Sequence, residues 1–175
     1  MTKYEIHKSW LIKENQEHFI SDCYRVKQHF EKMFPGKDAT WDYKYYNIFS
    51  ATSPSPLWYD LFKELCATIR NFAGDDRPLW VQSWLNFHTP DQVLDWHGHD
   101  WPFHGYISID PKDTNTAFEE YSIKNEIGSI YIGPGHRLHK VEVNNTYEGH
   151  RITLGFDVTD EIDRPYEMFS MIPVL

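Results

Sequence analysis

Apolar side chains in the first part of the chain recur at helical spacing. Between Asn15 and Phe34 they fall at steps of four, three, four and three residues, at Phe19, Cys23, Val26, Phe30 and Met33. Such steps place the side chains along one stripe of an α-helix. Pro35 and Gly36 follow directly, so we predict a helix that ends there.

A second helix is predicted over residues 57–73. Ser55 and Pro56 precede it; serine is a favoured N-cap residue, and proline fits the first turn of a helix. One face of the segment is apolar, formed by Leu57, Leu61, Leu65, Ile69 and Phe72. The polar run 74–78 contains glycine and proline and closes the helix.

The pattern changes after Pro78 to short segments that are rich in β-branched and aromatic residues and separated by turn residues. We predict strands there, at residues 79–87, 103–109, 116–123, 128–132, 138–143 and 151–158. Because helices come first and strands follow, we expect an α+β fold that is mainly β. In it, antiparallel sheets would curl around a pocket, with the two helices packed outside.

Three segments have weaker patterns. Residues 3–12 are expected to form a short strand or lead-in, and residues 37–56 an irregular segment. The closing residues 157–175 mix charges with Met168, Phe169, Met171 and Ile172. We expect this tail to lie back on the sheet.

The chain length of 175 residues favours a single domain. Within it we expect a helical support (1–78), a β core (79–158) and a C-terminal tail packed on that core (159–175). The formal net charge of −9 argues against a nucleic-acid partner, since a surface that follows phosphates is basic. The sequence leaves the oligomeric state open.

No apolar run approaches the ~18 residues of a membrane span, and the first residues lack the apolar centre of a signal peptide. We therefore expect a cytoplasmic protein with no membrane partner. Cys23 and Cys66 both fall inside apolar helical patterns. In a reducing compartment they are expected to be small core residues rather than a disulfide.

Candidate chemistry lies in the β part, at Asp95-Trp96-His97-Gly98-His99-Asp100. Residues two apart on a strand point to the same side, so His97 and His99 can face one point. His139, on another predicted strand, supplies a third imidazole. Imidazole suits iron, copper, nickel and zinc, and three protein ligands leave positions open for substrate. We predict that these three histidines bind one iron ion.

Arg151 and Thr153 stand two residues apart on the last predicted strand. Arginine offers a two-pronged donor to a carboxylate, and Thr153 would add a hydroxyl from the same face. We predict that the pair anchors an organic acid that chelates the metal. The alternative for Arg151 is a surface arginine on a polar edge.

The order of these motifs resembles that of the iron(II)- and 2-oxoglutarate-dependent oxygenases. The resemblance rests on Trp84-x-Asn86, His97-x-His99, Gly105-Tyr106-Ile107, Gly128, His139-x-Val141 and Arg151-x-Thr153. It covers roughly residues 80–158. Within the family, the pattern is similar to that of the small bacterial and phage-type members, which carry His-x-His where most relatives carry His-x-Asp.

The resemblance implies a double-stranded β-helix of the jelly-roll or cupin kind, with iron(II) at its open end and 2-oxoglutarate as cosubstrate. The far carboxylate of 2-oxoglutarate would lie against Arg151 and Thr153. Asn86 matches a position that binds the cosubstrate in some relatives, and His88 stands where they often have tyrosine. The implied reaction is a dioxygenase reaction with O2 that hydroxylates a C–H bond of a small molecule or an amino-acid side chain.

The sequence departs from the usual set of two histidines and one carboxylate, because position 99 is histidine. Either Asp100 turns inward as the third ligand, or three neutral imidazoles hold the iron; strand alternation favours His99. Asp95 shares the parity of the histidines and is a candidate acceptor for an imidazole N–H. The extra histidines His104, His136 and His150 are either groups that face substrate or ordinary structural and surface histidines.

Two other functions fit parts of the pattern. His-x-His with a distant histidine also occurs in cupin metalloenzymes such as thiol dioxygenases, although no glutamate follows His99 at the usual short interval and Arg151 would then be idle. The second alternative is a non-catalytic β-barrel binding module. Asn86 could equally cap a turn.

Overall fold

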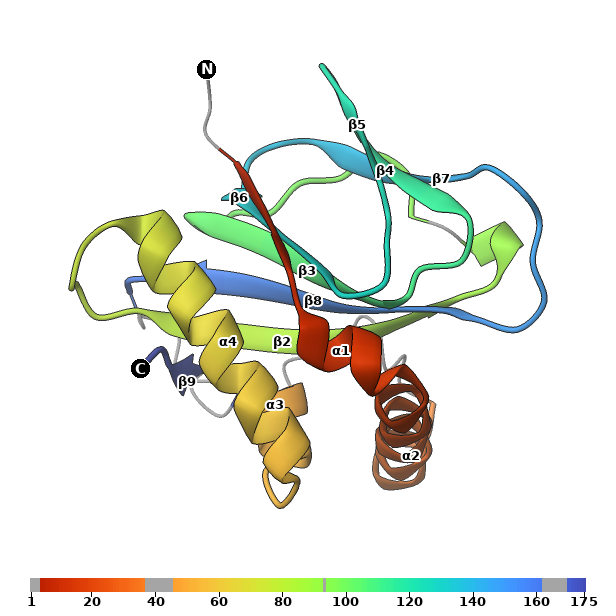
Figure 1. The fold of residues 1–175 in the computed structure, drawn as a ribbon, viewed down its shortest axis with the longest axis horizontal. Helices are drawn as coiled ribbons and strands as arrows, with labels where there is room; N and C mark the ends of the chain where they lie inside the picture. Colours follow the sequence, from red (N-terminus) through yellow and green to blue (C-terminus); the bar gives the residue numbers. More distant parts are fainter. Residues whose placement is uncertain (1–3, 37–45, 93, 162–169) are drawn as a thin grey trace.

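The computed structural model describes residues 4–36, 46–92, 94–161 and 170–175. Within these ranges the α-helices gather on one side of the β-structure (Figure 1): α1 (Trp10–Glu14), α2 (Gln16–Met33), α3 (Ile48–Ala51) and α4 (Pro56–Ala73). The 3-10 turn η2 (Pro90–Gln92) follows β2 and lies apart from them.

Antiparallel strands form two sheets, in the orders β1-β6-β3-β8-β2-β9 and β5-β4-β7. The strands are β1 (Glu5–Lys8), β2 (Trp80–His88), β3 (Phe103–Asp110), β4 (Thr114–Phe118), β5 (Ser122–Lys124), β6 (Ser129–Pro134), β7 (His139–Val143), β8 (Arg151–Thr159) and β9 (Ile172–Pro173). Neighbours in each order are often distant in sequence, because the chain passes between the sheets. The result is a double-stranded β-helix with helices outside, which confirms the predicted fold class.

One face of the larger sheet packs against the helices. Alternate side chains of β8 point to that face, since successive residues of a strand point to opposite sides. They join side chains of α2 and α4 in one buried cluster that includes Phe19, Cys23, Leu61, Leu65, Ile69, Ile152, Leu154, Phe156 and Val158. This cluster makes the larger sheet a rigid wall.

The opposite face of the same sheet carries the polar and aromatic residues of the alternate positions. On β8 these are Arg151, Thr153, Gly155 and Asp157. The register aligns Asn86 of β2 with Thr153, and aligns His104 and Tyr106 of β3 with Asp157 and Gly155. Three adjacent strands therefore present their polar positions to the space between the two sheets.

The two long helices match their predicted positions. Phe19, Cys23 and Phe30 of α2 are buried, whereas Met33 is 59% exposed, so the packed stripe ends one turn early. Helix α4 begins at Pro56, one residue before the predicted range, and ends at Ala73; its C-cap is Gly74, whose left-handed φ of 72° suits glycine.

Two predicted elements need correction. Residues 116–123 do not form one strand, because Phe118 N–H donates to the Tyr121 carbonyl at 2.7 Å and turns the chain back between β4 and β5. Residues 37–56 are not irregular throughout. Asn47 caps the short helix α3 by accepting the Phe49 N–H at 3.1 Å, while residues 37–45 lie outside the described part.

The described end of the chain returns to the larger sheet. Strand β9 pairs with β2, and Val174 N–H donates to the Leu79 carbonyl at 2.8 Å. Met171 is buried; Met168 and Phe169 lie outside the described residues. That the whole chain forms one domain stays a prediction.

Cys23 and Cys66 are buried and free, as expected of core residues. Among the described helices, none combines the length and the apolar character that a membrane crossing requires.

Candidate functional site

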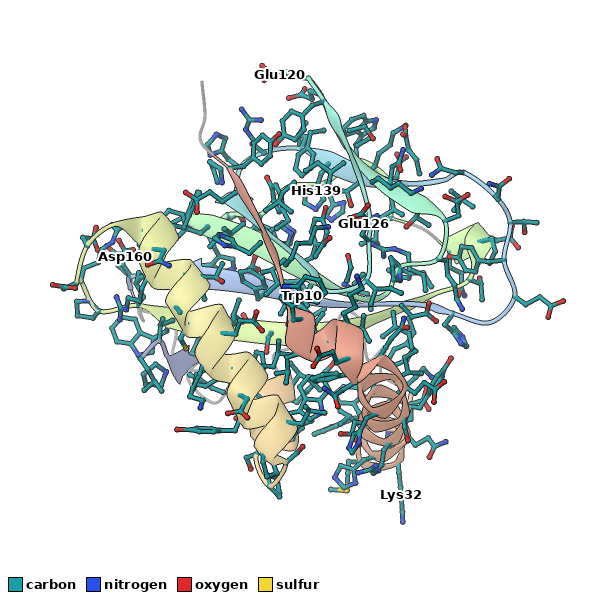
Figure 2. The ribbon with its side chains drawn as sticks, in the orientation of Figure 1. Trp10, Lys32, Glu120, Glu126, His139 and Asp160 are labelled. Carbon is teal, nitrogen blue, oxygen red and sulfur yellow. The ribbon has the colours of Figure 1, made fainter. Side chains whose placement is uncertain are left out.

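Three histidines meet between the sheets. His139 begins β7 and projects inward, in contrast to peripheral residues such as Glu120 (Figure 2). His97 and His99 lie on the loop that leads into β3, and one ligand nitrogen of each of the three rings lies within 4.8 Å of the others. The structure therefore brings together the three predicted metal ligands, at a spacing that one ion can span.

Backbone hydrogen bonds hold this loop in place. His97 and His139 form an isolated antiparallel bridge, with N–H···O distances of 3.0 and 2.9 Å. His99 N–H donates to the Gly135 carbonyl at 2.9 Å. The His-x-His segment is thus not a continuous strand, but its two ends are fixed against the β6–β7 connection.

Each of the three rings has its Nδ1 engaged on the side away from the meeting point. His97 Nδ1 donates to the Asp95 carbonyl at 2.7 Å, and His139 Nδ1 donates to the Arg137 carbonyl at 3.1 Å. His99 Nδ1 contacts the Asp157 carboxylate at 3.0 Å. An acceptor on Nδ1 fixes the tautomer and leaves Nε2 as the lone-pair donor.

The free nitrogens are suited to a metal. His99 Nε2 is buried and has no hydrogen-bond partner, which is costly unless a ligand completes it. Burial lowers the pKa of His139 to about 2 and also lowers that of His97. Both imidazoles therefore stay neutral and keep a lone pair for a cation.

Asp157 and His104 complete this end of the site, and sequence reasoning did not assign them these positions. His104 Nδ1 donates to Asp157 Oδ1 at 2.9 Å, and its ring stacks on His99 with centroids 3.6 Å apart. Burial opposes ionisation of Asp157, but the bonds from His104 and His99 outweigh it and hold the pKa of the carboxyl below its usual value. The sequence could have indicated Asp157, because it lies at an even spacing from Arg151 and Thr153 on the same strand and therefore points to the same side.

Arg151 lies at the other end of the chamber and is only 3% exposed. Burial lowers the pKa of Arg151 to about 10, so the side chain remains a cation at neutral pH. No carboxylate among the described residues pairs with it, and its Nε has no hydrogen-bond partner. A buried cation without a counter-ion is a site for an anion. The alternative of a surface arginine is wrong.

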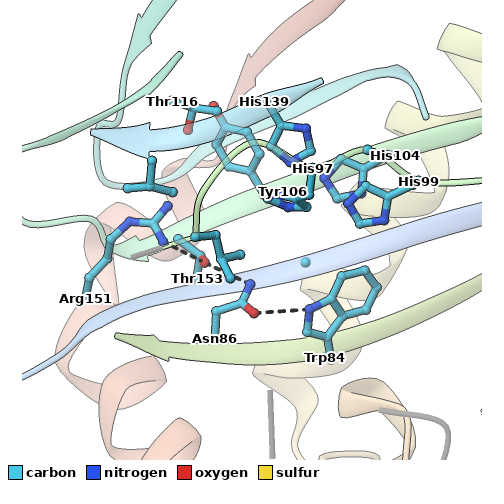
Figure 3. A pocket seen from close by; sticks show the side chains of 14 residues that line it. Trp84, Asn86, His97, His99, His104, Tyr106, Thr116, His139, Arg151 and Thr153 are labelled. Atoms are coloured by element: carbon cyan, nitrogen blue, oxygen red, sulfur yellow. Dashed lines mark hydrogen bonds between the residues drawn. The ribbon is translucent and has the colours of Figure 1, made fainter. Parts of the chain in front are cut away.

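Thr153 links Arg151 to Asn86. The Thr153 hydroxyl oxygen accepts from Arg151 Nη1 at 3.5 Å and from Asn86 Nδ2 at 3.3 Å, while Asn86 Oδ1 accepts from the Trp84 indole at 3.1 Å (Figure 3). With both lone pairs of the hydroxyl oxygen used, its proton is directed to a third group. Asn86 is therefore part of the pocket wall and does not cap a turn.

A cavity of about 210 Å³ joins the two ends of the site. Its lining includes the three histidines, Arg151, Thr153 and Asn86, together with Tyr106 from β3 of the larger sheet and Thr116 from β4 of the facing sheet (Figure 3). Burial raises the pKa of Tyr106 to about 12, so this phenol stays protonated and can donate. In the sequence, Tyr106 was noted only as part of the motif Gly105-Tyr106-Ile107, and no role in the pocket was predicted for it.

The other candidate residues lie elsewhere. His88 is buried beside Arg151 in the strand register but does not line the cavity. Asp100 is exposed, and its carboxylate is not among the atoms that lie close enough together to hold an ion with His97, His99 and His139. His136 is exposed, and His150 Nδ1 contacts the Tyr24 hydroxyl at 3.1 Å. Asp95 serves the site through its backbone carbonyl, while its carboxylate accepts the Trp96 N–H.

No protein-family model matches the chain, and no curated protein matches it. Solved structures do. The non-heme alpha ketoglutarate dependent carbocyclase SnoK from nogalamycin biosynthesis is similar with a TM-score of 0.62 at 14% identity, over 90% of this chain and 79% of SnoK.

Two further solved structures are similar in the same way. Iron-bound HygX from Streptomyces hygroscopicus has a TM-score of 0.59 at 13% identity, over 90% of this chain and 82% of HygX. The epimerase SnoN, in complex with Fe3+, alpha ketoglutarate and nogalamycin RO, has a TM-score of 0.59 at 12% identity, over 91% of this chain and 79% of SnoN. At these identities the comparison concerns the fold, and it shows that this chain has the double-stranded β-helix fold of these proteins.

Proposed function

We propose that this protein is an iron(II)- and 2-oxoglutarate-dependent oxygenase that hydroxylates a C–H bond of a small molecule or an amino-acid side chain. One observation carries the proposal. A single cavity has three inward imidazole nitrogens at one end and a buried arginine without a carboxylate partner at the other. This is the arrangement that a metal-bound dicarboxylate requires.

The metal end fits iron(II). His97, His99 and His139 would hold it through Nε2, and three protein ligands leave coordination positions open for an oxo acid and O2. Three neutral imidazoles leave the ion its full positive charge, which a dianionic oxo acid then neutralises. Iron-bound HygX and the SnoN complex with Fe3+ have the same fold, which supports this choice of metal.

The acid end fits the far carboxylate of 2-oxoglutarate. Arg151 would bind it as a charged donor, with the Thr153 hydroxyl donating from the same strand, β8, and the Tyr106 phenol donating from the neighbouring strand β3. Asn86 Nδ2 carries two N–H groups. One donates to the threonine oxygen, and the other would donate to the acid from the cavity wall. HygX has also been solved with nickel and 2-oxoglutarate bound.

Bound iron and 2-oxoglutarate would supply the activation of O2 and the oxidising power. The residues of this chain orient the acid, keep water from the buried end and hold the imidazoles of His97 and His139 in the neutral, metal-binding form. The substrate would enter from the histidine end, because His97 and His99 are partly exposed whereas Arg151, Thr153 and Asn86 are buried.

An anaerobic titration tests the proposal. Iron(II) and 2-oxoglutarate added to the protein without O2 should produce the weak visible charge-transfer band of the chelate, and O2 should then yield succinate. The Arg151→Ala variant should bind iron(II) as the wild type does but lose the band at the same 2-oxoglutarate concentration.

The alternatives predict other outcomes. A cupin-type thiol dioxygenase would bind iron and consume O2 with a thiol, whether or not Arg151 is present. A non-catalytic binding module would produce no succinate under any condition. Either result contradicts the proposal.

A further inference from the structure

We propose that Asp157 takes the place of the carboxylate that most related sites put directly on the metal, and that it acts one residue further out, through His99. His104 is the positioning residue that holds Asp157 in this role. The inference rests on the metal-binding half of the proposed function. It concerns which of the three imidazoles is the strong ligand.

The geometry makes Asp157 a bridge between two rings. Its side chain is 1% exposed, and its Oδ1 lies 3.0 Å from His99 Nδ1 and 2.9 Å from His104 Nδ1. Both contacts are on the far side of His99 from its free Nε2. The carboxylate can therefore influence a bound metal only through its hydrogen bond to the ring of His99.

The three predicted ligands are not equivalent. His97 and His139 donate to neutral backbone carbonyls, whereas His99 donates to a buried anion. A charged acceptor makes a stronger hydrogen bond and raises the basicity of the ligating nitrogen. His99 would therefore be the ligand that shares a negative charge with the metal, at the position where most of the oxygenases that the motifs resemble carry aspartate.

His104 leaves Asp157 little freedom to turn. Its ring lies against His99 at an interplanar angle of 12° and is 5% exposed, so a packed wall rather than solvent stands beside the carboxylate. Its Nδ1–H occupies the second acceptor position of Oδ1. Without that bond, Asp157 would keep a single partner and could rotate away from His99.

A second assignment of the same atoms is possible, since His99, His104 and Asp157 also lie close enough together to hold an ion. Their facing atoms, however, are already hydrogen-bonded to one another. An ion there would have to break both bonds, while an ion on the Nε2 side keeps them. The proposed role of Asp157 as a hydrogen-bond partner of His99 therefore agrees with both of its observed hydrogen bonds, whereas a bound ion at this position does not.

Cobalt(II) titration of the purified chain tests the inference without relying on turnover. Asp157→Asn can keep the Oδ1 acceptor for His104 but replaces Oδ2, together with the charge, by an amide NH2 that cannot accept from His99 Nδ1. We expect a 10–100-fold weaker cobalt(II) affinity, the usual size of such supporting contacts, with shifted cobalt absorption bands. Asp160→Asn, which removes a charge just beyond the same strand, should change neither.

A double-mutant cycle tests whether Asp157 affects metal binding through His99. In a His99→Asp background the carboxylate stands on the metal itself, so Asp157→Asn should no longer weaken cobalt(II) binding. An equal loss in both backgrounds would mean that Asp157 acts through the general field or through folding, and would overturn the inference.

Two variants test His104. His104→Asn retains an N–H donor near the Nδ1 position and should keep most of the affinity, whereas His104→Phe retains only the ring and should lose several-fold. Equal cobalt(II) affinities of the two variants would show that His104 only packs against His99 and does not position Asp157. A wild type that binds no cobalt(II) would contradict the proposed function itself, whereas normal binding by Asp157→Asn would contradict this inference alone.

Discussion

His97 and His139 exchange both of their backbone hydrogen bonds, at 3.0 and 2.9 Å, although they belong to different parts of the chain. A pair of this kind brings the two backbones as close as neighbouring strands. The distance between the two imidazoles is therefore determined by backbone pairing and not by flexible side chains. The ring centroids lie 4.3 Å apart.

Gly135 should be essential to this arrangement. Its carbonyl accepts the His99 N–H, and a Cβ at this position would lie 2.1 Å from the Trp101 carbonyl oxygen. Gly135→Ala should cost about 1–3 kcal/mol of unfolding free energy, the usual penalty of overpacking, and weaken metal binding. Urea unfolding and a cobalt(II) titration measure the two effects. Gly98→Ala, whose Cβ would meet nothing nearer than 3.4 Å, is the control and should be milder in both.

Thr153→Val should damage the acid end of the pocket without changing its shape. The substitution leaves Asn86 Nδ2 and Arg151 Nη1 without their shared acceptor, which costs about 1–3 kcal/mol, and removes the donated hydroxyl. Isothermal titration of the metal-loaded, oxygen-free protein should show weaker 2-oxoglutarate binding. Thr153→Ser keeps the hydroxyl and should bind nearly as wild type; an equal loss in both variants would show that the methyl group matters instead.

The metal-free protein should lose stability as the pH falls below about 6.5, the ordinary histidine pKa. Burial lowers the pKa of His104 to about 4 and that of His139 to about 2. Between pH 6.5 and 4 the unfolded chain therefore binds protons that the folded chain excludes. Unfolding free energy should drop by up to about 1.4 kcal/mol per pH unit for each histidine. Urea unfolding in chelator from pH 7.5 to 5 measures this, and a flat profile would contradict it.

Asn47 should matter for the attachment of the helices to the sheet. It caps α3, and its Nδ2 donates to the Val81 and Ser170 carbonyls at 3.0 and 2.6 Å. Asn47→Ala should destabilise the protein by about 2–4 kcal/mol, the sum of a lost cap and unsatisfied buried groups. Thermal unfolding measures it. The exposed Asn145→Ala should leave the unfolding temperature within a degree or two.

Local patterns were sufficient for much of the fold. The spacing of Phe19, Cys23 and Phe30 and of the leucines of α4 reflects the helical repeat, which needs no tertiary information. Richness in β-branched and aromatic residues did the same for β2, β3 and β8. This signal failed between Thr116 and Ile123, because the turn at Glu119 and Glu120 has no glycine, proline or asparagine to mark it.

The sequence alone also determined the identity of the groups at the two ends of the pocket: His97, His99 and His139, and Arg151 with Thr153. Only the tertiary structure decided that Arg151 is buried without a carboxylate partner among the described residues, that Asp100 is exposed and outside the histidine cluster, and that Asp157 rather than the Asp95 side chain contacts His99 Nδ1. The reason is physical. A repeat along one strand specifies which side chains share a face, whereas the register between strands decides which faces meet, and that register is set by contacts between residues far apart in the chain.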